Sequence, residues 1–264
     1  MRLVCLAGLI VAAAWIAPTA AAVPEYTAVV LRTYPHDAGA FTEGLLYQDG
    51  FLYESTGLAG QSSIRKVLLE TGEVVQHRDI DPRYFGEGIV IWQDKLIELT
   101  WKSHIGFVYD LATLRPRSNF HYAGEGWALT QDGHRLIMSD GTSDLRFLDP
   151  DSLGEIGRIH VTCDGRPIRN INELEWINGE IYANVWLTNV IVRIDPAAGE
   201  VVGLIDLSDL PDVTAEHPAD NVPNGIAYDA ATDRMFVTGK LWKLVYQVRL
   251  APRPRAKGLC QGLP

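Results

Sequence analysis

The sequence predicts an all-β fold, and an internal repeat is the main observation behind that prediction. Short runs with strand alternation recur along the chain, and no run shows the helical period. Five copies of a short motif begin at Glu43, Glu87, Glu125, Asn172 and Asn224. The copies are spaced by roughly 40 to 50 residues, and a unit of that length with about four strands is typical of a β-propeller. We therefore predict a five-bladed β-propeller.

Within each unit, the motif is expected to lie on the first strand, and a turn signal follows it. These signals are Asp49-Gly50, Asp94-Lys95, Asp132-Gly133, Asn178-Gly179 and Asp233-Arg234. An alternating run follows each turn and predicts a second strand at residues 51–56, 95–100, 135–139, 180–184 and 234–238. A third run follows in every unit, for instance at residues 106–109, 145–148 and 190–194.

The fifth unit is shorter than the others. It ends at Leu250, before Ala251-Pro252-Arg253-Pro254, and so lacks an outer strand. The segment from Thr27 to Tyr34 is β-branched and aromatic and belongs to no other unit. We predict that this N-terminal strand completes the last blade, which closes the ring and removes an exposed edge.

The N-terminal residues are typical of a secretory signal peptide. Arg2 precedes an apolar run from Leu3 to Ala17, and Ala20 to Ala22 provide an A-x-A cleavage site. The run is too short to span a bilayer as a helix. We expect residues 1–22 to be removed and residues 23–264 to form one domain that is exported, periplasmic or secreted, without a membrane attachment. A non-cleaved anchor is the alternative.

Composition and charge exclude further classes. The chain has 23 Lys+Arg against 33 Asp+Glu, a net charge of -10, which argues against nucleic acid as a partner. Cys163 and Cys260 have no C-x-x-C spacing for zinc, and whether they pair stays open. The histidines show no H-x-x-x-H spacing and are expected to be surface or structural residues. A closed ring needs no partner to cover its edges, which favours a monomer.

The repeat also predicts a functional site, because equivalent positions on the first strands of a propeller meet near the axis. This places Glu43, Glu87, Glu125, Asn172 and Asn224 in one ring. Crowded carboxylates raise one another's pKa and can carry protons. Two alternatives stay open, namely solvated residues at a channel mouth and a calcium site, since calcium favours carboxylate and carboxamide oxygens.

Tryptophans are expected beside this ring. Trp101 and Trp186 follow the second strands of their units, and the matching places hold Gly57, Ser139 and Thr238, with Lys240 just beyond the last. Together with Trp127, they favour an aromatic-walled pocket at the same mouth as the acids. Core packing is the alternative for any one of them.

Motifs in every unit resemble those of the plant-type glutaminyl-peptide cyclotransferases. The motifs are residues 41–45, 54–65, 85–88, 139–143, 172–175, 224–227 and 238–242. The resemblance extends from about Ala28 to Leu250 and implies a five-bladed propeller. It also implies an enzyme that converts the N-terminal glutamine of peptides and proteins to pyroglutamate with release of ammonia, using no metal or organic cofactor.

The resemblance assigns the pocket to Phe41, Glu43, Phe85, Glu87, Trp101, Trp127, Asn172, Trp186 and Lys240. Glu87 would carry the proton and Glu43 would hold the cationic amine. Asn172 and Lys240, or an indole N–H, would stabilise the oxyanion. The aromatic residues would enclose the substrate, and Glu125 and Asn224 are further candidate substrate contacts. Plant members have Gln at the position of Glu43, so this residue departs from the pattern.

Two other functions stay open at this point. In a calcium-dependent hydrolase or lactonase, the acid ring would hold the metal. A non-catalytic propeller would instead bind exported partners on its surface. The mixture of acids, an amide and tryptophans at one mouth favours the enzyme over a flat binding face.

Overall fold

The computed structural model describes residues 22–213, 221–253 and 258–264. Within these residues, the chain forms 22 strands and one four-residue helix, α1 (Leu259–Gly262), so the prediction of an all-β fold is confirmed. The predicted signal peptide lies outside the described residues except for Ala22. In the described part of the chain, no helix has the length and apolar character needed to cross a membrane.

Three four-stranded antiparallel sheets follow one another along the chain. The first contains β2 (Thr42–Gln48), β3 (Phe51–Thr56), β4 (Ser63–Leu68) and β5 (Glu73–Asp79). The second contains β6 (Gly86–Trp92), β7 (Lys95–Thr100), β8 (Ile105–Asp110) and β9 (Pro116–His121). The third contains β10 (Ala128–Gln131), β11 (Leu136–Ser139), β12 (Asp144–Leu148) and β13 (Glu155–His160). A small hairpin of β14 (Thr162–Cys163) and β15 (Arg166–Pro167) follows.

The remaining strands form one eight-stranded sheet. One half consists of β16 (Ile171–Ile177), β17 (Glu180–Val185), β18 (Val190–Ile194) and β19 (Val201–Asp206), and the other of β20 (Pro223–Asp229), β21 (Arg234–Gly239) and β22 (Leu244–Pro252). Strand β1 (Glu25–Pro35) lies between the halves, antiparallel to β22 over most of its length and parallel to the end of β19. The N-terminal segment thus adds the fourth strand that the last half lacks.

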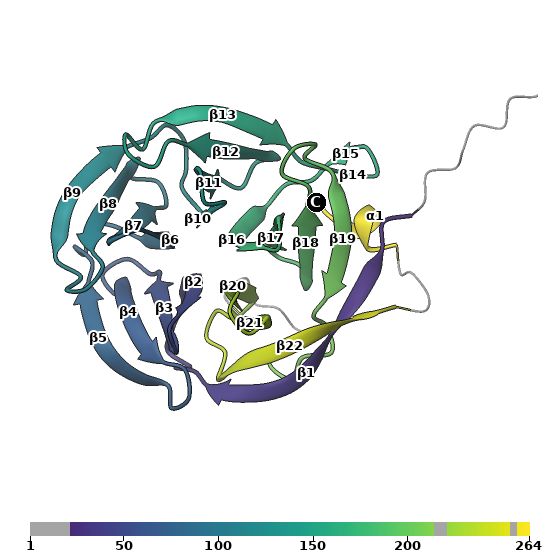
Figure 1. Ribbon diagram of the computed structural model, residues 1–264, viewed down its shortest axis with the longest axis horizontal. Coiled ribbons are helices and arrows are strands. Elements are labelled where there is room, and N and C mark those ends of the chain that lie inside the picture. The colour runs from purple at the N-terminus through teal and green to yellow at the C-terminus, as the bar shows by residue number, and fades with distance from the viewer. Residues whose placement is uncertain (1–21, 214–220, 254–257) are drawn as a thin grey trace, which may run out of the picture.

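The sheets are arranged in a ring around a common centre (Figure 1). Strands β2, β6, β10, β16 and β20 are innermost, and each contacts the next, with β20 contacting β2 again. Buried clusters join each pair of neighbouring sheets; one, for example, combines Leu45 and Leu52 with Ala227 and Phe236. The first sheet is therefore packed against the last strands of the chain, which closes the ring through the hydrophobic core.

Turn residues explain why the strands begin and end where they do. Asp49 and Gly50 have φ values of 51° and 87°, and Asn178 and Gly179 have φ values of 50° and 89°. Two successive positive φ values define the type I′ turn, which fits a two-residue hairpin and favours Asn-Gly and Asp-Gly. The predicted turn signals at these positions therefore set the register of the strand pairs β2–β3 and β16–β17.

The C-terminal residues are attached to the ring by a disulfide. Cys163 in β14 and Cys260 in α1 are bonded, with their Cα atoms 5.8 Å apart, which answers the pairing question that the sequence left open. Two hydrogen bonds reinforce the attachment, from Leu259 N to Glu25 Oε1 (2.9 Å) and from Arg169 N to the Pro264 carbonyl (2.8 Å).

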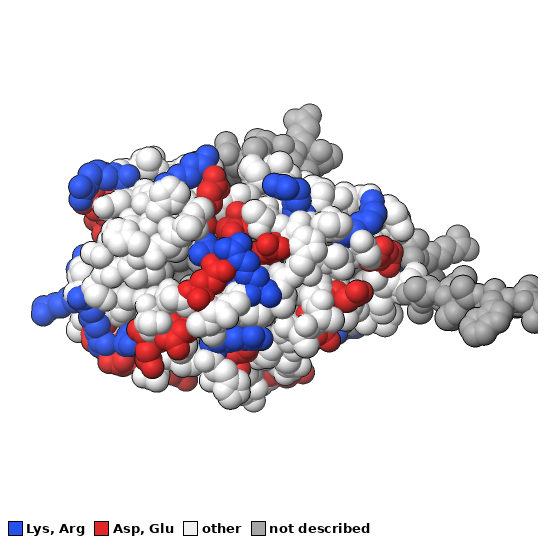
Figure 2. Space-filling view, turned by 90° about the horizontal axis from the view of Figure 1, so that it is seen from above, with Lys and Arg blue, Asp and Glu red and all other residues white. Residues whose placement is uncertain are grey.

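The surface carries interspersed basic and acidic side chains on the face drawn in Figure 2.

Candidate active site

A cavity of about 230 Å³ lies at the end of the ring where the innermost strands begin. Its lining residues are Phe41, Glu43, Leu58, Phe85, Glu87, Trp101, Trp127, Asn172, Trp186 and Lys240. The structure therefore brings together all nine residues that the family resemblance assigned to the pocket. It adds Leu58, which lies within the motif at residues 54–65 but was not assigned to the pocket, and leaves Glu125 and Asn224 outside the lining.

The third sheet does not follow the predicted alignment of the repeat. Ser55 and Ser139 are equivalent, because each donates its hydroxyl to a backbone carbonyl on the innermost strand of the next sheet (2.6 and 2.8 Å). In the first sheet, Ser55 pairs with Gly44, and the ring residue Glu43 directly precedes Gly44. In the third sheet, Ser139 pairs with Ala128, so the residue that directly precedes Ala128 takes the ring position. Trp127, and not Glu125, therefore takes the ring position in that sheet.

A second set of equivalent positions follows the second strand of the first two sheets and of both halves of the eight-stranded sheet. Its members donate their backbone N–H to a carbonyl at 2.8 to 3.1 Å, in the pairs Gly57–Phe41, Trp101–Phe85, Trp186–Asn170 and Lys240–Val222. Lys240 is thus the counterpart of the two tryptophans, so the assignment of this position to Thr238 is wrong. The assignment of Ser139 is wrong as well, because Ser139 is equivalent to Ser55, two residues before Gly57. Gly57 is required here, since a Cβ would lie 2.5 Å from the Phe85 ring.

An ion pair lies at the base of the cavity. Lys240 Nζ is 2.5 Å from Glu43 Oε1, and both side chains are buried. Lys240 Nζ also lies 4.4 Å from the centroid of the Phe41 ring, in a cation–π contact. Asn224 donates its Nδ2 to Glu43 Oε2 (3.3 Å) and to the Thr42 carbonyl (2.9 Å). Asn224 therefore holds Glu43 by a hydrogen bond and does not line the cavity, whereas a substrate contact was predicted for it.

Glu43 and Glu87 form a coupled carboxyl pair. Burial raises the pKa of Glu87 well above its ordinary value, the charge of Glu43 raises it further, and Lys240 opposes both. Burial also raises the pKa of Glu43, and Lys240 and a hydrogen bond from Glu87 offset only part of this rise. The pair consequently holds a proton on Glu87, which donates it in a hydrogen bond to the Glu43 carboxylate.

Glu125 organises the tryptophan wall. Its Oε2 accepts hydrogen bonds from Trp101 Nε1 (2.7 Å) and Trp127 Nε1 (2.9 Å), and its side chain is 35% exposed at the rim. Trp127 in turn packs edge-to-face on Trp186, with ring centroids 5.7 Å apart. Because the indoles of Trp101 and Trp127 already donate to Glu125, neither has its N–H free for an oxyanion.

Asn172 supplies an unused hydrogen-bonding group. The residue is only 4% exposed and lines the cavity, and its Oδ1 has no hydrogen-bond partner among the described residues. A buried acceptor without a partner is costly, and such groups are expected where a ligand supplies the missing donor. Asn172 is therefore positioned to accept a hydrogen bond from a bound N–H group.

A second cavity, of about 290 Å³, has different properties. It is lined by the far ends of the innermost strands and includes Tyr47, Trp176, Tyr228 and Glu175. Burial raises the pKa of Glu175 to about 8, but its Oε1 already accepts a hydrogen bond from Tyr228 N (3.0 Å). The second cavity contains none of the predicted site residues, and the carboxyl pair and the unpartnered amide lie in the first cavity.

In the described ranges, no three His, Cys, Asp or Glu side chains are grouped as a metal site requires.

The fold and this cavity define a class of protein, an all-β protein whose ring of strands holds a small aromatic-walled cavity with a buried carboxyl pair. The family model for glutamine cyclotransferase matches residues 3–250. A glutaminyl-peptide cyclotransferase from Arabidopsis thaliana is 44% identical over 225 residues, which cover 84% of this chain and 70% of that protein. The crystal structure of Myxococcus xanthus glutaminyl cyclase superposes with a TM-score of 0.81 at 36% identity, covering 87% of this chain and 99% of that one. The chain therefore belongs to the glutamine cyclotransferase family.

Proposed function

We propose that this cavity converts the N-terminal glutamine of peptides and proteins to pyroglutamate and releases ammonia. The observation that carries the proposal is a buried carboxyl that keeps its proton, Glu87, beside the Glu43–Lys240 ion pair. Membership of the glutamine cyclotransferase family supports the same activity.

The reaction is an intramolecular acyl transfer. The α-amine nitrogen attacks the carbon of the side-chain amide, a new N–C bond closes a five-membered ring, and the bond to the departing nitrogen breaks. One proton leaves the attacking amine and one joins the departing ammonia. Proximity is largely provided by the substrate. An α-amine titrates near pH 7.7–8.0, so a neutral fraction is present at physiological pH.

Glu87 is the residue suited to both proton transfers. It gives its proton to the departing nitrogen, and the carboxylate that results takes a proton from the attacking amine, so the enzyme ends in its starting state. Glu43 holds the amino group before reaction. Lys240 supplies positive charge for the oxyanion.

The remaining lining residues bind the substrate and exclude water. Asn172 Oδ1 accepts a hydrogen bond from an N–H of the glutamine, which gives this buried acceptor a partner. The aromatic wall consists of Phe41, Phe85, Trp101, Trp127 and Trp186. This scheme uses no metal and no organic cofactor.

We also propose that the fold is a five-bladed β-propeller formed by residues 23–264 as a single domain. The cyclic contacts of the five innermost strands and the position of β1 beside β22 support this architecture. The N-terminal pattern supports a signal peptide at residues 1–22 and hence an exported protein, periplasmic or secreted. The closed ring, which needs no partner to cover a sheet edge, supports a monomer.

Incubation of the folded protein with a Gln-initiated peptide tests the proposed activity. We expect release of ammonia and formation of the pyroglutamyl peptide, with the same rate in the presence of a chelator. Absence of turnover in a folded preparation would contradict the proposal. Loss of turnover on chelation would instead indicate that the carboxyl pair works with a calcium ion.

A further inference from the structure

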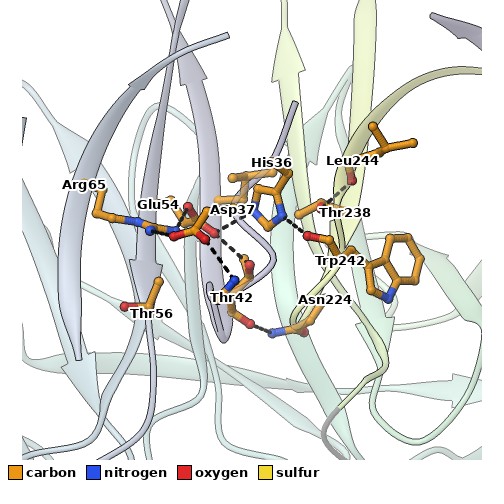
Figure 3. A network of polar contacts seen from close by, with 12 residues as sticks. His36, Asp37, Thr42, Glu54, Thr56, Arg65, Asn224, Thr238, Trp242 and Leu244 are labelled. Atoms are coloured by element: carbon orange, nitrogen blue, oxygen red, sulfur yellow. Dashed lines mark hydrogen bonds and ion pairs between the residues drawn. The ribbon is translucent and has the colours of Figure 1, made fainter. Parts of the chain in front are cut away.

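A network of buried charged residues lies outside the cavity, between the first sheet and the turn that joins β21 to β22 (Figure 3). Glu54, on β3, is at its centre with a side chain 2% exposed. Its Oε1 accepts hydrogen bonds from Thr42 Oγ1 (2.7 Å) and His36 Nε2 (2.9 Å). Its Oε2 pairs with Arg65 Nη2 at 2.5 Å, and Arg65 Nη1 pairs with Asp37 at 2.7 Å. The mechanism proposed above uses none of these groups.

His36 is a buried cation in this network. Its Nε2 faces the Glu54 carboxylate, and its Nδ1 faces the Trp242 carbonyl at 2.7 Å. Both partners can only accept, so both ring nitrogens must carry hydrogen. Burial lowers the pKa of His36 and Arg65 opposes the charge, but Glu54 and the Trp242 carbonyl outweigh them and raise it. The expectation of a surface or structural histidine is therefore refined to a buried, protonated one.

Glu54 is the matching anion. Burial alone would raise its pKa, but the charges of His36 and Arg65 and the hydrogen bond from Thr42 lower it to about 2. Two cations, His36 and Arg65, thus face two anions, Glu54 and Asp37. Each charge in the network therefore faces a partner of opposite charge.

Two connections lead from the network to the cavity. Thr42 directly precedes Glu43, and its carbonyl accepts the hydrogen bond from Asn224, the amide that also contacts Glu43. On the other side, Trp242 belongs to the turn that carries Lys240. The network therefore holds both chain segments that supply the Glu43–Lys240 ion pair.

We propose that the Glu54–His36 pair positions the Glu43–Lys240 ion pair beside Glu87, with Glu54 fixing Thr42 and His36 fixing the turn at Trp242. This inference rests on the proposed function of the cavity. Glu54, His36 and Thr42 are positioning residues, since none of them lines the cavity. A displacement of about 1 Å at a reacting group can cost about 100-fold in rate, so loss of one such bond should affect turnover more than substrate binding.

The test compares variants that each change one side chain of the network. Thr42→Val removes the hydroxyl that donates a hydrogen bond to Glu54, and Thr42→Ser keeps this hydroxyl. Glu54→Gln removes the negative charge that pairs with His36. The control is Asp206→Asn, which breaks a different buried ion pair, with Arg253 Nη1 at 2.9 Å, and does not contact the cavity. For each variant we would measure thermal stability, kcat and KM for a Gln-initiated peptide, and the pH–rate profile.

We expect Thr42→Val and Glu54→Gln to lower kcat by roughly 10- to 100-fold, to change KM less, and to move the pH–rate profile. Thr42→Ser should recover most of the kcat, and Asp206→Asn should lower the melting temperature alone. If Thr42→Val and Glu54→Gln lose stability but keep the parental kcat and pH–rate profile, the network is only structural and the inference is wrong.

A second readout separates this inference from the proposed function. Titration of ¹³C-labelled glutamate carboxyls by NMR follows Glu43 and Glu87 without substrate. An inactive parent protein would contradict the proposed activity, and the carboxyl titration would still decide the positioning role. A titration that differs between Thr42→Val and the parent supports that role, and identical titrations overturn it.

Discussion

Glu43 and Glu87 occupy equivalent positions on adjacent inner strands, yet their surroundings give them different protonation states. Lys240 pairs with Glu43 at 2.5 Å and stabilises its charge. Burial and the nearby charge of Glu43 keep the proton on Glu87. Two carboxyls whose pKa values are driven apart can divide the roles of acid and anion between them. In the proposed mechanism, Glu87 moves the proton while Glu43 binds the amine.

Replacement of Glu43 by Gln tests this division. Glu43 raises the pKa of Glu87 by its charge and by accepting its hydrogen bond, so Glu43→Gln should lower that pKa. If Glu87 must be protonated to release ammonia, the alkaline limb of the pH–rate profile should move to lower pH. The measurement is kcat against pH for parent and variant. An alkaline limb at the same pH in both would contradict the coupling of the two residues.

The pocket could be predicted from sequence wherever the repeat or a family motif placed a residue. The failures have local causes. Glu125-Gly126 matches the Glu-Gly sequence of the repeat, but it lies two residues before the residue that occupies the ring position. Only the pairing of Ala128 with Ser139 shows that Trp127 occupies this position. Leu58 lies in an irregular segment with a φ of 77° that no periodicity marks. The partners of His36 are far away in sequence, so its burial could not be predicted.

At the scale of elements, strand β1 is the segment that closes the ring. It pairs with β22 from Tyr26 to Pro35 and with β19 through its first residues. Tyr26 and Thr27 of β1 pair with Pro252 and Ala251. Strand β22 therefore extends to Pro252, past the predicted end at Leu250. The sequence indicated the partner of this strand, but the length of β22 depends on a contact between distant parts of the chain.

Deletion of residues 23–34 tests the role of β1. Without this strand, β22 loses the partner along its outer edge, and the halves of the eight-stranded sheet lose the strand that joins them. We expect the shortened protein to lose cooperative unfolding. Calorimetry or urea unfolding followed by circular dichroism would measure this. A shortened protein that melts like the parent would show that the ring closes without β1.

At the scale of the whole molecule, buried carboxyls outside the site make stability depend on pH. Glu98 is fully buried, Tyr109 donates its hydroxyl to Oε2 (2.9 Å), and Oε1 has no partner among the described residues. Burial raises the pKa of Glu98 from 4.5 to about 8. Below pH 4.5, the group is protonated in both states. Between 4.5 and about 8, the unfolded chain releases this proton while the folded protein keeps it, so stability falls as pH rises.

Glu98→Gln should remove this contribution, because glutamine stays neutral at every pH. We expect the free energy of unfolding of the parent to fall between about pH 5 and pH 8, and the variant to lose less, by on the order of a few kcal/mol. Urea unfolding of both proteins at the two pH values measures the difference. Parallel pH dependences would show that Glu98 ionises in the folded protein much as it does in the unfolded chain.

In the proposed mechanism, Glu87 transfers the proton when N-terminal glutamine is cyclised in this cavity. The most direct measurement is the rate of ammonia release from a Gln-initiated peptide by the parent and by Glu87→Gln, with both shown to be folded by circular dichroism. We predict turnover by the parent and a rate lower by roughly two to four orders of magnitude in the variant, as expected for loss of a general acid–base group. A variant rate within a few-fold of the parent rate would contradict the claim.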